Sequence, residues 1–163
     1  MKTHSQVVTR TAMNRNAWIS TGVALVVAFS MIAGLRAGQS GDSLYQRLGG
    51  QPAIQAVASG LVDRILLDTR VNRWFAHAAS SPENAAAYKV KLADFVCQAT
   101  GGPCKYTGRD MATAHKGRAV TGEAFDAVVQ DLVVVLETLK VPEKEKGQLL
   151  ELLAPLKASI VQQ

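Results

Sequence analysis

A tyrosine, a methionine and a histidine stand close together in a segment that lacks a helical pattern. This segment, residues 102–120, holds Tyr106, Met111 and His115 among glycines and a proline. A loop of this length in a small protein is usually functional or disordered. Its aromatic, sulfur and imidazole groups favour a function, because disordered segments are poor in apolar side chains. His115 is therefore the first candidate for chemistry.

Most kinds of histidine chemistry have little support elsewhere in the chain. After the first forty residues the histidines are His77, which we expect at the surface, and His115, and no nucleophile elbow accompanies them. Glu123, Asp126 and Asp131 fall at ordinary exposed helix positions, and a zinc site would need more cysteine or histidine. A single histidine suffices to hold haem iron, because the porphyrin supplies four nitrogens. A lone histidine is, however, more often structural.

The segments around this loop carry apolar residues at the three- and four-residue spacing of α-helices. Four main helices are predicted, at 51–67, from Ser81 to Gly101, from Thr121 to Leu139 and from Pro142 to Ile160. Ser81 and Thr121 are of the type that caps a helix N-terminus. No alternating strand pattern or glycine-rich phosphate loop occurs. The expected class is therefore all-α, with one domain at 43–163.

The first forty residues have a different composition. Residues 1–16 contain three basic residues and no acid, residues 17–35 carry no charge and are largely apolar, and Arg36 follows. This pattern predicts a transmembrane anchor or signal sequence at 17–36, with residues 37–42 as a linker. The expected location is the bacterial inner membrane with the domain in the periplasm. A periplasmic domain released by signal cleavage is the alternative.

Charge and cysteine content limit the partners. The net charge is +5, but from Asp42 onward fourteen bases are balanced by all thirteen acids and form no cluster. A nucleic-acid partner is therefore not expected. Cys97 and Cys104 are separated by a glycine pair and a proline, so the chain can turn back between them. They form either a disulfide or two small buried apolar side chains, and the sequence leaves both open.

A set of motifs resembles the group I truncated haemoglobins. The motifs are, in order, Ser43 to Gly50, Ile54, Val71 to Phe75, Gly101-Gly102-Pro103, Tyr106-Thr107-Gly108, Met111 and His115. The likeness begins near Ser43, runs to the end of the chain and includes none of the first forty residues. It implies a two-over-two helical sandwich around haem b, with Tyr106 among the cofactor-binding residues.

The resemblance assigns roles on one side of the haem. It implies that His115 is the proximal iron ligand and that Met111, one helical turn earlier, lines the pocket beneath the haem. Phe75 matches a phenylalanine that packs on the porphyrin, with core packing as the simpler alternative. Lys91 and Arg118 are expected to pair with the haem propionates, although a solvated lysine is equally compatible with the sequence.

The opposite side departs from the family's usual pattern. Val62 stands where the family often has a tyrosine, and Leu92 stands where it often has a glutamine. Tyr88, one turn before Leu92, is the remaining candidate donor to a bound gas, because a donor stabilises the partial negative charge of bound O2. If Tyr88 points outward, the pocket is apolar.

Reversible binding of O2, NO or CO is the function that the resemblance implies first. The alternatives are an NO dioxygenase or a peroxidase-like haem enzyme, and a haem-based gas sensor that acts through a partner. A reductase is expected as electron donor, and the membrane is expected as a partner through the N-terminal helix. A haem-free helical interaction module is disfavoured, because such a module does not need His115 or the segment from Tyr106 to Met111.

Overall fold

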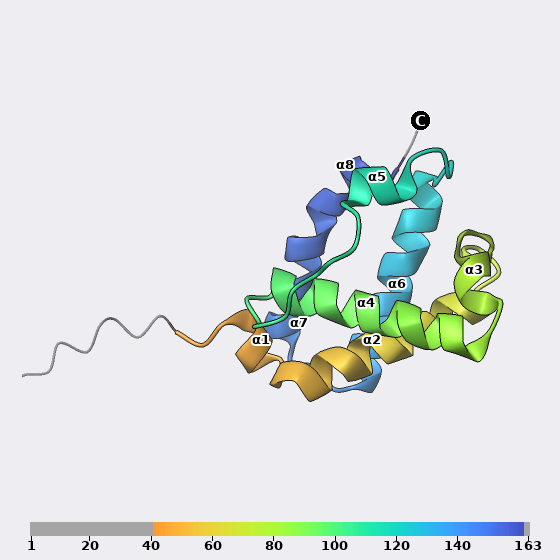
Figure 1. Ribbon diagram of the computed structural model, residues 1–163. Helices are drawn as coiled ribbons and strands as arrows, with labels where there is room; N and C mark the ends of the chain where they lie inside the picture. Colours follow the sequence, from red (N-terminus) through yellow and green to blue (C-terminus); the bar gives the residue numbers. More distant parts are fainter. Residues whose placement is uncertain (1–40, 162–163) are drawn as a thin grey trace, which may run out of the picture. The chain divides into compact units, whose positions relative to one another are not determined.

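Helices make up all the regular structure of residues 41–161, the part of the chain that the computed structural model describes (Figure 1). The elements are α1 (Leu44–Arg47), α2 (Gly50–Leu67), η1 (Asn72–Phe75), α3 (Ala76–Ala79), α4 (Pro82–Ala99), α5 (Met111–His115), α6 (Gly122–Thr138), α7 (Glu143–Leu153), η2 (Ala154–Leu156) and α8 (Lys157–Ile160). No strand occurs in this described part, which confirms the predicted all-α class.

Side-chain caps fix where the long helices begin. Ser81 Oγ and Thr121 Oγ1 each accept a hydrogen bond, at 3.2 Å, from the backbone N–H three residues later. Both caps were predicted from the sequence, and Pro82 occupies the first turn, where its missing N–H costs nothing. Beyond α4, Gly101 has a φ of +84°, a conformation that only glycine adopts without strain. The chain therefore turns sharply as α4 ends.

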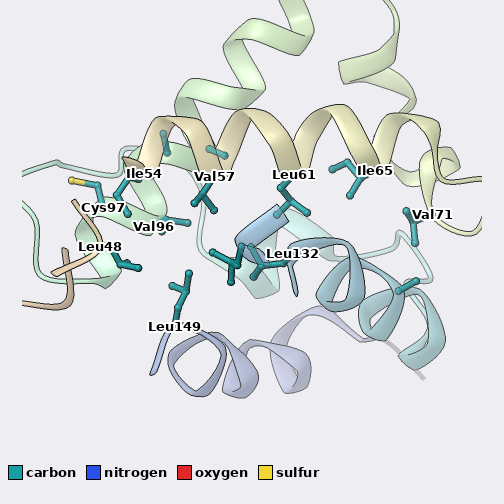
Figure 2. Close-up of a cluster of buried hydrophobic side chains, with 14 of the residues drawn as sticks. Leu48, Ile54, Val57, Leu61, Ile65, Val71, Val96, Cys97, Leu132 and Leu149 are labelled. Atoms are coloured by element: carbon teal, nitrogen blue, oxygen red, sulfur yellow. The ribbon is translucent and has the colours of Figure 1, made fainter. Parts of the chain in front are cut away.

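The core lies where α2 packs against α4 and α6 (Figure 2). The stripe predicted along α2, which consists of Ile54, Val57, Leu61 and Ile65, is fully buried. On α4 the buried side chains are Ala93, Val96 and Cys97. The larger apolar side chains of the same helix are only half-buried. A second apolar face of α4 thus remains incompletely covered by protein.

The last predicted helix, from Pro142 to Ile160, is interrupted. α7 ends at Leu153 and is followed by the short 3₁₀ turn η2, which contains Pro155. Proline lacks the N–H that a continuing helix needs, so the axis breaks here. α8 then packs against α5, and Lys157 Nζ lies 2.7 Å from Asp126 Oδ1 on α6. The break places α8 beside the segment that carries His115.

The prediction that Asp131 is exposed is wrong. Its side chain is on the inner face of α6 and the residue is 2 % exposed. Arg64 of α2 donates to Asp131 Oδ1 at 3.0 Å from both Nε and a terminal nitrogen. A buried carboxylate needs such a partner because it has lost its hydration. The error arose because Arg64 is 67 residues away in sequence.

The predicted location, in the bacterial inner membrane with the domain in the periplasm, is wrong. Within residues 41–161 no helix is long and apolar enough to cross a membrane. The two longest helices of this part carry charges along their exposed faces, for example Asp63 on α2 and Lys91 on α4, and are therefore unsuited to a bilayer. The segments 1–16 and 17–36, and most of the linker 37–42, lie outside the described residues.

Candidate functional site

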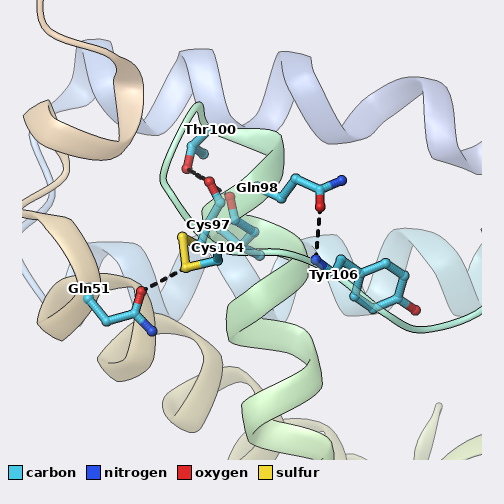
Figure 3. Close-up of a disulfide and its surroundings, with 7 residues drawn as sticks. Gln51, Cys97, Gln98, Thr100, Cys104 and Tyr106 are labelled. Carbon is cyan, nitrogen blue, oxygen red and sulfur yellow. Dashed lines mark hydrogen bonds between the residues drawn. A yellow bond between two sulfur atoms is a disulfide. The ribbon is translucent and has the colours of Figure 1, made fainter.

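The connection between α4 and α5 runs without a helix and is tied back to α4 at three points. Figure 3 shows two of them, the disulfide and a hydrogen bond. Cys97 and Cys104 form a disulfide with a Cα–Cα distance of 5.7 Å, which resolves the alternative left open by the sequence. Tyr106 N donates to Gln98 Oε1 at 2.8 Å. The Tyr106 ring meets Phe95 edge-on, with ring centroids 5.2 Å apart. This loop is therefore ordered by specific contacts.

α5 orients the imidazole of His115. Asp110 Oδ1 caps the helix by accepting from Thr113 N at 2.9 Å. Hydrogen bonding by the Thr113 side chain, and secondly by this backbone N–H, lowers the pKa of the Asp110 carboxyl. His115 Nδ1 lies 2.8 Å from the carbonyl oxygen of Met111. Because a carbonyl can only accept, Nδ1 carries the proton and Nε2 presents a lone pair. This is the arrangement of a histidine that ligates a metal through Nε2.

The chain that follows His115 is anchored to η1. Trp74 Nε1 donates to the carbonyl oxygen of Arg118 at 2.9 Å. Arg118 Nε in turn donates to the carbonyl oxygen of Ala114 at 2.9 Å. The guanidinium carbon of Arg73 lies 3.9 Å from the centre of the Trp74 ring. Arg73 and Arg118 thus line the same surface hollow as the indole, and neither arginine has a carboxylate partner among the described residues.

Half-buried apolar side chains of α4 form the opposite wall. Tyr88, Leu92 and Phe95 lie one helical turn apart on the same face. The Tyr88 ring meets Phe75 edge-on at a centroid distance of 5.7 Å. Burial raises the pKa of Tyr88 to about 12, with smaller electrostatic effects from Tyr106, which raises it, and Arg118, which lowers it. Tyr88 therefore faces the same region as the segment on either side of α5, rather than solvent.

The remaining predicted residues are placed as follows. Met111 is half-buried on α5, one turn before His115. Val62 is completely buried on α2. Lys91 is exposed and has no ion pair in the described part of the chain, whereas its neighbour Lys89 pairs with Asp63 at 2.6 Å. His77 is exposed, as predicted, and offers no buried ligand position.

These residues fit haem. In Figure 1, α5 lies across from α4, and α8 packs on both α5 and α6. The half-buried apolar side chains of α4 and α5, such as Tyr88, Leu92 and Met111, are only partly covered by other protein atoms. A flat apolar ring such as a porphyrin could cover the rest of their surface. His115 offers one nitrogen, and residues 41–161 contain no group of three or more His, Cys, Asp or Glu side chains that could hold a metal ion. Haem iron needs only this one, because the porphyrin supplies four nitrogens.

Residues 43–162 match the family described as bacterial-like globin. A group 1 truncated hemoglobin of Synechocystis is 35% identical over 106 residues, which are 63% of this chain and 82% of the relative. One from Mycolicibacterium paratuberculosis is 32% identical over 72% of this chain and 83% of its own length. The chain belongs to the group I truncated globins.

A solved structure agrees with this membership. The 2/2 hemoglobin from Synechococcus, in the cyanomet state and with covalently attached heme, superposes with a TM-score of 0.66 at 27% identity, over 75% of this chain and all of that one. The truncated globin described here therefore has haem with iron as its cofactor and haem-based gas binding as its general function. These relatives are hemoglobins by name and give no support to the predicted membrane location.

Sequence reasoning missed two residues that shape this site. Asp110 caps α5, and its position three residues before Thr113 is a capping signal that the sequence does contain. Trp74 fixes the segment after His115 through the carbonyl of Arg118, a contact across 44 residues that leaves no local signal. Both act on the orientation of α5 and so on the direction of the His115 ring.

Proposed function

We propose that this truncated globin reversibly binds a diatomic gas, with O2 first and NO or CO as alternatives, and that His115 is the proximal ligand. The observation that carries the proposal is the 2.8 Å contact between His115 Nδ1 and the Met111 carbonyl. It fixes the tautomer and leaves Nε2 free for iron. When bound, haem supplies an iron with an open position for gas. The sequence, the family and this contact support the same residue.

On the proximal side the proposed roles follow from position. The hydrogen bond to the Met111 carbonyl holds the His115 ring in one orientation, as outer partners of ligating histidines do. Met111 and Phe75 supply apolar surface for the porphyrin. Arg118 and Lys91 are the proposed partners of the propionates, since both are basic and have no carboxylate partner in the described region.

On the distal side Tyr88 is the proposed hydrogen-bond donor to the gas. Among the described residues its hydroxyl makes no hydrogen bond with protein, so it is available as a donor. Its raised pKa of about 12 keeps it protonated at every physiological pH. Val62 and Leu92 carry no polar group, so the pocket depends on this one phenol. A single donor favours the polar ligand O2 over CO.

Haem uptake and gas binding test the proposal. The full chain is titrated with haemin, reduced with dithionite under argon, and exposed in turn to CO and O2 while the visible spectrum is recorded. We expect stoichiometric haem and reversible spectral changes with both gases. His77→Ala, an exposed histidine, should behave as wild type, whereas His115→Ala should lose tight haem binding. Uptake that is unaffected by His115→Ala would refute the proximal assignment.

A further inference from the structure

The disulfide joins the end of α4 to the loop that carries α5 (Figure 3). Cys97 is fully buried in the core, whereas Cys104 is the partly exposed first anchor of the loop. Gln51 Oε1 of α2 lies 3.0 Å from Cys104 Sγ, so the bridge also touches a second helix. Gly102 lies inside the ring that the disulfide closes, where a Cβ would come within 2.6 Å of Cys97 Sγ. The bridge is therefore packed into its surroundings rather than loosely attached.

A continuous series of contacts leads from the disulfide to the histidine. Two residues after Cys104, the Tyr106 ring packs on Phe95, and its hydroxyl donates to the carbonyl oxygen of Arg109 at 3.0 Å. Gly108 lies directly against this ring, and a Cβ at this position would force the Tyr106 ring to shift. The next residue after Arg109 is Asp110, the cap of α5. The position of Cys104 is thus transmitted to the helix that holds His115.

α5 cannot hold its own position. It contains five residues, and none of its side chains is fully buried. An isolated helix of this length is unstable, because nucleation costs more than its few hydrogen bonds return. Its orientation therefore depends on contacts at its two ends and on α8. After α5 the anchor is the hydrogen bond from Trp74 to Arg118, and before α5 it is the loop fixed by the disulfide.

We propose that the Cys97–Cys104 disulfide positions the proximal histidine, and that its reduction by a dithiol loosens residues 104–115 and weakens the hold on haem. This inference rests on the proposed ligation by His115. Cys97 and Cys104 are thus positioning residues that act through the loop and α5. The disulfide makes haem retention dependent on the thiol redox state of the surroundings.

The chemical step is a thiol–disulfide exchange. A thiolate of the dithiol attacks Cys104 Sγ, the more accessible sulfur, and forms a mixed disulfide with it. The protein S–S bond breaks, and its electron pair leaves on Cys97 Sγ, which takes up a proton. The second thiol of the reductant then attacks the reductant sulfur that is bonded to Cys104 Sγ. Cys104 leaves as a thiolate and takes up a proton, and the reductant closes into a cyclic disulfide. Two electrons and two protons have moved from the dithiol to the protein.

The test compares three forms of the full chain loaded with haem. They are the oxidised wild type, the wild type reduced by dithiol and then desalted under argon, and the Cys97→Ser/Cys104→Ser double variant. Haem loss is measured as transfer to excess apomyoglobin. The iron–histidine stretching band of the ferrous protein is measured by resonance Raman. Loss of an outer contact to a metal ligand typically lowers metal affinity 10- to 100-fold. We therefore expect haem loss to be roughly tenfold faster from the reduced wild type and from the double variant than from the oxidised wild type.

The expected pattern separates positioning from general weakening. The iron–histidine band should shift or broaden in the reduced and double-variant proteins, and dithiol should have no effect on the double variant. Arg64→Ala serves as the matched control, since it breaks a contact between α2 and α6 away from α5. It should lower stability without moving the band. A band shift in Arg64→Ala equal to that on reduction would overturn the positioning role.

Two further outcomes would also overturn the inference. One is an unchanged haem-loss rate and an unchanged band after reduction. The other is loss of the far-ultraviolet helical signal on reduction, which would mean that the disulfide holds the whole domain rather than the proximal segment. Failure of the proposed function looks different: the oxidised wild type would not bind haem, or the band would persist when His115 is replaced by glycine.

Discussion

Replacing Tyr88 by phenylalanine removes the hydroxyl that we propose as the donor to bound gas, while keeping the ring that packs on Phe75. The ring centroids of Tyr88 and Phe75 are 5.7 Å apart, and phenylalanine at position 88 retains the aromatic ring that makes this contact. The phenol is neutral because burial raises its pKa to about 12. The substitution therefore deletes one hydrogen-bond donor with little change in packing.

The size of the effect follows from the charge on the acceptor. A hydrogen bond to a charged acceptor contributes about 1.5–3 kcal/mol. Each 1.4 kcal/mol corresponds to about a tenfold change in an equilibrium constant. With Val62 and Leu92 unable to replace the donor, we expect O2 to dissociate about 10- to 100-fold faster from Tyr88→Phe. CO, which carries less negative charge, should change by less than about threefold on the same scale.

Stopped-flow displacement of O2 by CO measures the dissociation rate directly. Tyr45→Phe is the matched control, because Tyr45 is a half-buried tyrosine on α1, packed beside Gly50 rather than in the pocket. Its O2 dissociation rate should equal that of wild type. Equal rates in wild type and Tyr88→Phe would refute the role of Tyr88. Equal acceleration of O2 and CO would show that the substitution had opened the pocket rather than removed a donor.

Arg64→Ala should lower the free energy of unfolding by about 2 kcal/mol in urea titrations, because the buried Asp131 loses its partner; an unchanged midpoint would contradict this. Gly102→Ala should cost about 2 kcal/mol, since its Cβ would come within 2.6 Å of Cys97 Sγ. Above pH 10 the wild type should lose stability up to about pH 12, because Tyr88 ionises more readily once unfolded. Urea titrations of Tyr88→Phe should show a smaller loss over this range.

The helical frame follows from local rules and could be predicted. The stripe of Ile54, Val57, Leu61 and Ile65 is buried because its spacing matches the helix period. The caps Ser81 and Thr121 could also be predicted, because each accepts a hydrogen bond from a residue only three positions away. The break at Pro155 was also visible as a residue type, although the apolar spacing across it favoured one continuous helix.

The contacts that complete the site join residues that are distant in sequence. Asp131 looked like a surface residue because its partner Arg64 lies on another helix. The pairing of Cys97 with Cys104 depends on the sharp turn after α4, which brings their Cα atoms to 5.7 Å. His115 could be selected as a ligand from its motif. The hydrogen bond of its Nδ1 to Met111 required the backbone of α5, and no residue spacing specifies it.

Ligation by His115 is tested most directly by removing the imidazole and giving it back. The ferrous iron–histidine stretching band is recorded by resonance Raman for wild type, His115→Gly and His115→Gly with added imidazole, with His77→Gly as control. We expect the band in wild type and His77→Gly, its loss in His115→Gly, and its return when imidazole fills the cavity. A band that persists in His115→Gly without imidazole, or is absent from wild type, would contradict the account.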